Sequence, residues 1–233
     1  MDILLASGSP RRRELLESAQ IDFSVMSVDI DETPFAHESP KDYVQRMIAT
    51  KAEAIITQLD ADYKSDQFKH FKLSTPFIML TADTIGVLAD GKTVLVKPEN
   101  RAHAYSMWQQ MSDNTHQVWT AVQATVVSFS AEPSSAKLVN ETLITEKRFF
   151  QAIWQRQMIE QTDVSFIPLT QEIMRDYWDS GEPADKAGGY AIQGLAAAWV
   201  TRIHGSYTNV VGLPLAQTLA LLNEAMSAYS IIK

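Results

Sequence analysis

Three arginines stand at the start of a predicted helix, in the run Ser7-Gly8-Ser9-Pro10-Arg11-Arg12-Arg13. Ser9 suits the N-cap position because serine accepts a bond from a free backbone N–H, and Pro10 suits the first helical position. Arginine is unfavourable at this end of the helix dipole, whereas backbone N–H groups and guanidinium groups there both bind phosphate oxygens. The run therefore indicates either a phosphate site or a solvated basic helix end.

Carboxylates are clustered in the segment Asp29-Ile30-Asp31-Glu32-Thr33-Pro34, and a further one, Asp83, follows a strand predicted at residues 76–80. Clustered carboxylates repel one another unless a cation lies among them, and Mg²⁺ or Mn²⁺ prefers oxygen ligands. A carboxylate just past a strand of an open α/β sheet can hold a metal or orient water. The alternatives are an ordinary acidic loop and a turn-forming aspartate.

Two lysines and two loops complete the candidates. Lys51 on a predicted helix and Lys97 before Pro98 would each be ordinary solvated lysines if taken alone. Residues 181–194 combine charged side chains, glycines and Gln193, and residues 204–214 form a second loop before a helix. Glycines let a backbone approach a ligand closely, although a purely structural loop has a similar composition.

Several other kinds of site are excluded. The sequence has no Walker A, G-x-G-x-x-G, G-x-S-x-G or H-E-x-x-H motif. It has no cysteine, which excludes disulfides, thiolate zinc sites and a cysteine nucleophile and favours a reducing compartment. Because no export signal or membrane-spanning run is visible, we expect a cytoplasmic protein without membrane contact.

The charge of the chain limits its partners. The 233 residues carry 20 Lys+Arg against 28 Asp+Glu, a formal net charge of −8, in an otherwise ordinary globular composition. Such a field repels polyanions, so extended nucleic-acid binding is disfavoured. A small phosphorylated ligand remains compatible if cations are concentrated locally and a divalent metal offsets its charge.

The elements that must position these residues are mixed strands and helices. Strands are predicted at residues 3–6, 76–80, 85–88, 93–96, 117–130, 164–167 and 198–203, and helices at about 11–19, 39–59, 99–111, 170–180 and 213–229. Residues 61–72 are predicted as a surface excursion, and residues 149–154 fit either a short helix or an extended hairpin. This order, without internal repeats, predicts an α/β fold.

Taken in order, these segments resemble the Maf family of nucleotide pyrophosphatases. The matching stretches are Leu5-Ala6-Ser7-Gly8-Ser9-Pro10-Arg11-Arg12-Arg13-Glu14-Leu15-Leu16, Asp29-Ile30-Asp31-Glu32-Thr33-Pro34, Lys51-Ala52, Ala82-Asp83-Thr84, Lys97-Pro98, residues 112–116, Asp185-Lys186-Ala187-Gly188, Ile192-Gln193-Gly194, and residues 205–215. The resemblance implies a single domain over residues 1–233, with insertions near 61–72 and 140–161. The chain departs from the family pattern at Thr81, Val96 and Gly189.

The resemblance also implies a fold and a site. The fold is an elongated mixed sheet with two lobes around a deep cleft, similar to inosine triphosphate pyrophosphatases. By matching position, phosphates are bound by Ser9, Arg12 and Arg13, and the catalytic cleft is completed by Glu32, Lys51, Asp83 and Lys97. We expect Mg²⁺ or Mn²⁺ near Glu32 and Asp83, with Asp83 orienting and deprotonating the attacking water, because hydrolysis of a phosphoanhydride needs positioning and charge neutralisation.

Three residues indicate the subgroup. Arg11, Thr84 and Gln193 resemble the members that act on dTTP and UTP rather than on 7-methyl-GTP, and an amide such as Gln193 can donate to and accept from a pyrimidine edge. We therefore expect a nucleoside triphosphate as the partner, hydrolysed to the monophosphate and pyrophosphate. The alternative is a nucleotide-binding regulator of cell division without turnover. A homodimer is an open expectation.

Overall fold

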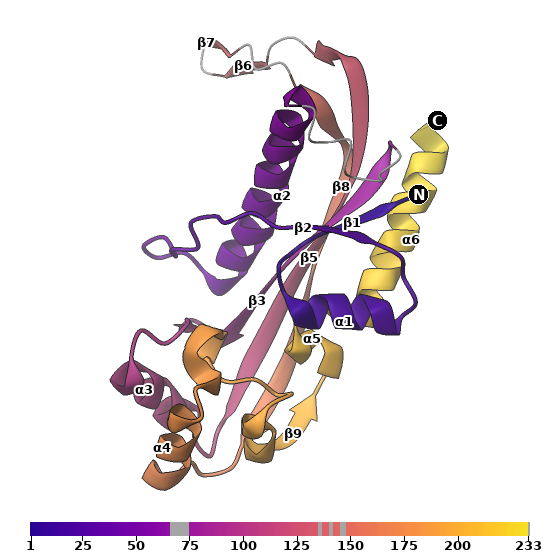
Figure 1. The fold of residues 1–233 in the computed structure, drawn as a ribbon. Coiled ribbons are helices and arrows are strands. Elements are labelled where there is room, and N and C mark those ends of the chain that lie inside the picture. The colour runs from indigo at the N-terminus through magenta and orange to yellow at the C-terminus, as the bar shows by residue number, and fades with distance from the viewer. Residues whose placement is uncertain (66–74, 135–136, 140–141, 145–147, 233) are drawn as a thin grey trace.

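The computed structural model describes residues 1–65, 75–134, 137–139, 142–144 and 148–232. The molecule is elongated, and a twisted central sheet runs along its length (Figure 1). Among the described residues this sheet has seven strands: β1 (Ile3–Ala6), β2 (Ser24–Met26), β3 (Phe77–Val87), β4 (Val94–Leu95), β5 (Thr115–Ser134), β8 (Arg148–Phe166) and β9 (Val200–His204). A separate pair is formed by β6 (Lys137–Val139) and β7 (Thr142–Ile144).

The strand order of the large sheet is β2-β1-β3-β5-β8-β9, with β4 beside β3. β1 runs parallel to β2 and to β3, whereas the other pairs are antiparallel. The predicted mixed α/β fold is therefore confirmed.

Six α-helices surround the sheet within the described part of the chain: α1 (Pro10–Ser18), α2 (Pro40–Lys64), α3 (Arg101–Met111), α4 (Gln171–Asp179), α5 (Tyr207–Val211) and α6 (Leu215–Ile232). Side-chain caps start several of them, as at Ser39, whose hydroxyl accepts the Asp42 N–H. In Figure 1, α2 covers one face of the sheet and α1 and α6 lie on the other. No described helix is both long and apolar enough to cross a membrane.

The side chains of β3 alternate between the two faces of the sheet and therefore pack against the helices on both sides. Phe77 and Met79 pack in the cluster that includes the buried side of α2, whereas Ile78, Leu80 and Ala82 pack in the cluster that includes α6. Successive side chains of a strand point to opposite faces, so odd-numbered residues of β3 face α2 and even-numbered residues face α1 and α6. This parity decides where the polar residues further along β3 point.

Several predicted boundaries were wrong. The strands predicted at 76–80 and 85–88 are parts of the one strand β3 (Phe77–Val87), so Asp83 lies inside a strand and not past its end. The strand predicted at 164–167 begins much earlier, at Arg148 of β8, and residues 149–154, for which a short helix and an extended hairpin were both open, are extended within it. The physical reason is the same in both cases: β5 pairs with β3 over residues 77–87 and with most of β8, and this long ladder overrides the local polar composition.

The predicted surface excursion at 61–72 was also wrong in its first part, because α2 continues through Lys64. Residues 66–74 and parts of the predicted insertion at 140–161 lie outside the described residues. The rest of that insertion, from residue 148, is strand β8.

An aromatic cluster holds the end of the molecule that carries α3 and α4. Trp108 of α3 lies 5.4 Å from Tyr177 of α4 between ring centroids, and Tyr177 lies 4.5 Å from Trp199. Trp108 Nε1 also donates to the Gly188 carbonyl at 3.1 Å. These contacts fix the loop of residues 186–195 against the helices, and that loop forms one wall of the site.

Candidate active site

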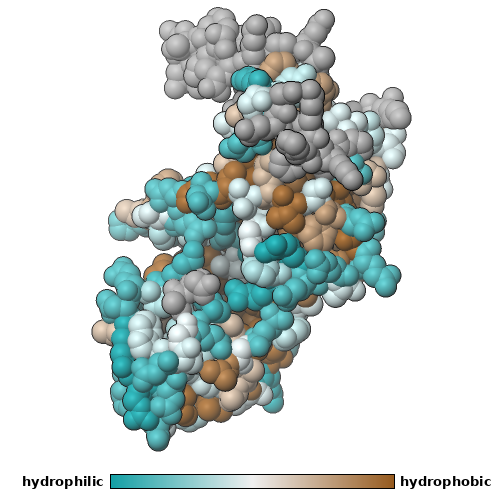
Figure 2. All heavy atoms as spheres, viewed as in Figure 1, coloured by the Kyte–Doolittle hydropathy of each residue, from teal (hydrophilic) through white to brown (hydrophobic). Residues whose placement is uncertain are grey.

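A cleft opens where one edge of β3 is left without a strand partner. β1 pairs with residues 78–81 and β4 with residues 86–87, so within the described chain residues 82–85 have no neighbouring strand on that edge. The cleft has a volume of about 770 Å³. In Figure 2 the surface is hollowed between the loop before α2 and the end that carries α3, and hydrophilic side chains gather on the α3 side. The predicted cleft is present.

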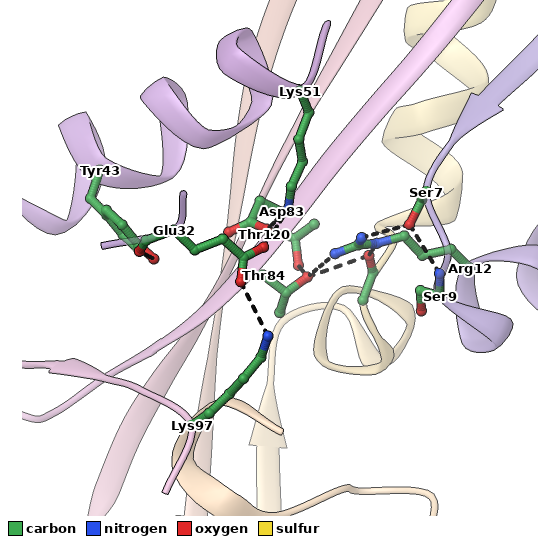
Figure 3. A network of polar contacts seen from close by, with 11 residues as sticks. Ser7, Ser9, Arg12, Glu32, Tyr43, Lys51, Asp83, Thr84, Lys97 and Thr120 are labelled. Atoms are coloured by element: carbon green, nitrogen blue, oxygen red, sulfur yellow. Dashed lines mark hydrogen bonds and ion pairs between the residues drawn. The ribbon is translucent and has the colours of Figure 1, made fainter. Parts of the chain in front are cut away.

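Asp83 and Thr84 occupy this gap and point to opposite faces of β3. Asp83, an odd-numbered residue, faces α2, where Lys51 Nζ lies 2.5 Å from its Oδ1 atom. Thr84 faces α1, and its hydroxyl accepts a bond from Arg12 Nη2 at 3.1 Å. One strand therefore supplies both halves of the polar network in Figure 3.

Glu32 links two lysines across the cleft. Its Oε1 lies 3.1 Å from Lys51 Nζ and its Oε2 lies 3.1 Å from Lys97 Nζ. Partial burial by itself would raise the pKa of Glu32, but the two lysines outweigh it and hold that pKa below its usual value. Because Lys51 and Asp83 are each only 14% exposed, this part of the network is shielded from solvent, whereas Lys97 at 61% is not. The four residues predicted as catalytic are thus brought together.

α2 positions both Lys51 and the loop that carries Glu32. Lys51 lies one turn after Met47 and one turn before Ile55, on the buried stripe of the helix, so its side chain is directed at the sheet. Tyr43 donates its hydroxyl hydrogen to the Glu32 carbonyl at 2.8 Å. Burial, followed by the charges of nearby carboxylates, raises the pKa of Tyr43 to about 12, so the hydroxyl stays protonated and keeps this bond.

Three nitrogen atoms of the Arg12 guanidinium donate hydrogen bonds to other groups of the protein. Nε donates to the Gly212 carbonyl at 2.8 Å, Nη1 to Ser7 Oγ at 3.0 Å, and Nη2 to Thr84 Oγ1 at 3.1 Å. Desolvation lowers the pKa of this guanidinium, and the charge of Asp83 opposes that shift. A guanidinium has five N–H groups, so Nη1 and Nη2 each keep one for a ligand. Arg12 therefore ties α1 to β3 and to the segment before α6 while it lines the cleft.

The remaining residues of the first turn are placed differently from one another. Ser9 and Arg11 line the cleft, but Arg13 is not among its lining residues. The Nη2 atom of Arg13 lies 3.5 Å from the Gly8 carbonyl oxygen instead. The resemblance paired Arg12 with Arg13 as phosphate ligands, whereas the helix directs Arg11 and Arg12 into the cleft and Arg13 away from its lining.

Two residues that the sequence analysis missed complete the network. Ser7 accepts from Arg12, and Thr120 of β5 lies directly across from Thr84, with 2.9 Å between the two hydroxyl oxygens. Thr120 also donates to the Asn209 carbonyl at 3.0 Å. Thr120 lies in an alternating strand pattern like many other threonines, and no sequence signal marked it.

The carboxylates fit a divalent cation that arrives with a ligand. Glu32 Oε1 and Asp83 Oδ1 both contact Lys51, and the described residues contain no group of three or more His, Cys, Asp or Glu side chains able to hold a metal. Mg²⁺ commonly takes one or two carboxylates and completes its shell with water and phosphate oxygens. The residues present match this mode rather than an all-protein metal cage.

The chain matches the family model described as Maf-like protein over residues 2–225. It is 62% identical over 226 residues to a protein of Psychrobacter cryohalolentis, covering 96% of this chain and 97% of the relative. It is 63% identical to a protein of Psychrobacter arcticus, covering 96% and 95%, and 41% identical over 222 residues to one of Vibrio vulnificus, covering 95% and 97%. All three relatives are named dTTP/UTP pyrophosphatase.

Proposed function

The chain belongs to the Maf family, and from this premise we propose that it is a nucleoside triphosphate pyrophosphatase that hydrolyses dTTP and UTP to the monophosphate and pyrophosphate. The observation that carries the proposal is the cluster of Lys51, Asp83, Glu32 and Lys97 at the gap in the sheet edge. Two carboxylates held between two ammonium groups combine a base for water with charges that stabilise phosphates.

Asp83 is suited to act on the attacking water. Lys51 occupies its Oδ1 atom, which leaves Oδ2 without a donor among the described residues. A carboxylate oxygen in this position orients a water molecule toward the α-phosphorus and accepts its proton as the new P–O bond forms. Lys51 fixes the carboxylate and lies beside the developing negative charge.

Positive charges are needed to stabilise the negative charge on the departing pyrophosphate. The described residues that line the cleft include five cationic side chains and four carboxylates, namely Arg11, Arg12, Lys51, Lys97 and Lys186 against Asp29, Glu32, Asp83 and Glu99. This near balance leaves much of a triphosphate's charge uncompensated. Asp83 and Glu32 would hold Mg²⁺ or Mn²⁺ together with phosphate oxygens, and such an ion would supply the missing positive charge and lower the pKa of a bound water.

The nucleobase of the substrate would lie near Gln193, whose side chain is exposed at the cleft. Its amide offers both a donor and an acceptor to the alternating carbonyl and N–H groups of uracil or thymine. A site built around such bonds rejects a base that leaves its polar groups unpaired. The preference for dTTP and UTP follows from this arrangement.

The proposal is tested by measuring pyrophosphate release from a panel of dTTP, UTP, CTP, ATP, GTP and 7-methyl-GTP. We expect dTTP and UTP to be hydrolysed well above ATP, GTP and 7-methyl-GTP. Nucleotide binding without release of pyrophosphate from any member would instead support the alternative, a regulator without turnover. Faster hydrolysis of 7-methyl-GTP than of either pyrimidine would overturn the subgroup alone.

Replacing Gln193 by leucine is expected to flatten the base preference. The ratio of kcat/KM for UTP to that for ATP should fall about tenfold, the effect of one lost hydrogen bond, while the best rate changes less. Gln110→Leu, on the surface of α3, is the matched control and should keep the ratio of the unmodified protein. An unchanged ratio in Gln193→Leu would remove Gln193 from base recognition.

We expect Arg12 and Arg13 to contribute differently to nucleotide binding. Arg12→Ala is expected to weaken binding of a non-hydrolysable UTP analogue about tenfold to a hundredfold, since it removes a charged donor from the cleft. It should also lower the melting temperature, because three bonds between separate segments are lost. Arg13→Ala, which changes a residue outside the cleft lining, should weaken binding less. Calorimetry on both variants checks the order, and equal losses would contradict this placement.

We further propose that the protein acts in the cytoplasm, where nucleotide pools are found, and that it forms a homodimer. The absence of cysteine supports a reducing compartment. Sedimentation of the purified chain at several concentrations tests the assembly state, and a monomer throughout would exclude the dimer.

A further inference from the structure

The turn that carries Gln193 is held from both sides by side chains of the preceding segment. The backbone N–H of Ala191 donates to the Tyr177 hydroxyl at 3.3 Å, and the backbone N–H of Leu195 donates to Glu182 Oε2 at 3.0 Å. Gln193 itself lies exposed in the cleft, with no side-chain hydrogen bond to the described residues. Its position therefore depends on these two backbone anchors.

The two anchoring side chains are bonded to each other. The Tyr177 hydroxyl donates to Glu182 Oε1 at 2.9 Å, and the Tyr177 ring is packed against Trp108 and Trp199. Burial, followed by the bond to Glu182, raises the pKa of Tyr177, so its hydroxyl keeps the proton that it donates. Gly181, at a φ of 76°, reverses the chain after α4 and returns Glu182 to this ring.

Gly194 allows the Glu182 carboxylate to lie close to the turn. A Cβ atom added to Gly194 would lie 1.9 Å from Glu182 Oε1, so the carboxylate would have to leave its present position. The N–H of Gly194 also closes the turn on the Ala191 carbonyl at 3.1 Å. Glycine at position 194 therefore makes room for the Glu182 carboxylate directly beside Gln193.

We propose that Glu182 is a positioning residue that sets the base preference by holding Gln193 in place. The inference rests on the proposed function, in which Gln193 binds the edge of the base. The carboxylate is suited to this role because each of its oxygens accepts from a different donor, the Tyr177 hydroxyl and the Leu195 N–H. An amide has one acceptor oxygen, so glutamine at position 182 cannot accept from both donors. In one orientation its –NH₂ group faces the Leu195 N–H, and in the other it faces the Tyr177 hydroxyl, which would have to become an acceptor from the amide as well as from the Ala191 N–H.

Glu182→Gln is therefore expected to lower the ratio of kcat/KM for UTP to that for ATP by about tenfold, the effect of one lost hydrogen bond. The KM for UTP should rise, while kcat stays within about threefold, because the contacts between Lys51 and Asp83 are unchanged. A purely structural role would lower kcat/KM for both nucleotides together and leave the ratio unchanged. The ratio also does not depend on the fraction of folded protein.

A double-mutant cycle with Gln193→Leu tests whether Glu182 acts through Gln193. If it does, Glu182→Gln lowers the ratio in the unmodified protein but changes it less than about twofold in the Gln193→Leu background. Glu172→Gln on the exposed side of α4 is the matched control and should keep the ratio in both backgrounds. Equal, additive losses in the two backgrounds would overturn the inference, as would an unchanged ratio in Glu182→Gln.

A thermal melt would reveal whether the Glu182→Gln protein folds. If it does not, a second variant still tests the inference. Tyr177→Phe keeps the packed ring but removes the hydroxyl that links Glu182 to Ala191, and it should lower the ratio in the same direction. An unchanged ratio in Tyr177→Phe would count against the inference. Failure of the proposed function is seen separately, as an unmodified protein that does not prefer UTP over ATP.

Discussion

Asp83→Asn is expected to abolish the hydrolysis of UTP and dTTP while nucleotide binding is retained. The substitution keeps the size of the side chain and one oxygen for Lys51, but it removes the negative charge that accepts a proton from water. Loss of a general base typically costs about 10²- to 10⁴-fold in rate, and loss of support for the cation adds to this. Nucleotide binding should be retained, because the substitution removes a negative charge beside a triphosphate.

Single-turnover release of pyrophosphate and calorimetry with a non-hydrolysable UTP analogue measure the two effects separately. Asp22→Asn, which changes an exposed aspartate between α1 and β2, is the control and should keep the original rate. A rate for Asp83→Asn within about threefold of the original, or about 0.7 kcal/mol in the barrier, would be incompatible with the role of Asp83.

Removal of divalent metal by a chelator is expected to eliminate turnover, and addition of Mg²⁺ or Mn²⁺ should restore it. The reason is that carboxylates offset most of the cationic charge of the cleft, so the side chains alone do not neutralise a triphosphate. Turnover that continues in metal-free protein would rule out the cation near Glu32 and Asp83.

Binding of Mn²⁺ supplies a readout besides activity. We expect weak binding to the free protein, because both candidate carboxylates contact Lys51, and stronger binding in the presence of the non-hydrolysable analogue, which adds phosphate oxygens. The melting temperature of the free protein should be unaffected by the chelator. Equally tight Mn²⁺ binding with and without the analogue would contradict a cation that arrives with its nucleotide.

Much of the local structure could be predicted from the sequence because it depends on local signals. Ser39 and Pro40 start α2 as predicted, and the apolar periodicity that follows packs against the sheet. The residues of the catalytic cluster were also identified, through resemblance to a family. Lys51 could have been recognised without it, since it is a lysine on an otherwise apolar stripe of a helix.

Predictions from local sequence patterns were wrong where the structure is set by pairing between strands that are far apart in the sequence. Residues 81–84 contain two threonines and an aspartate, which suggested a turn, but β5 pairs with every one of them and keeps β3 continuous. Asp83 accordingly lies beside the carboxyl end of β1, where Ala6 is opposite Thr81, and not at the end of its own strand.

The sequence by itself determined the fold class, the family and most of the polar residues from which the site is built, although it did not identify Ser7 or Thr120. Only the tertiary structure decided which of those side chains lie together and which line the cleft. The direction of each side chain depends on its position along the strand or helix and on its partners across the sheet. The tertiary structure placed Asp83 toward Lys51 and Thr84 toward Arg12 on opposite faces of β3. It also placed Arg12 in the cleft lining and Arg13 outside it, a difference of one residue that turns a side chain by roughly 100° around a helix of 3.6 residues per turn.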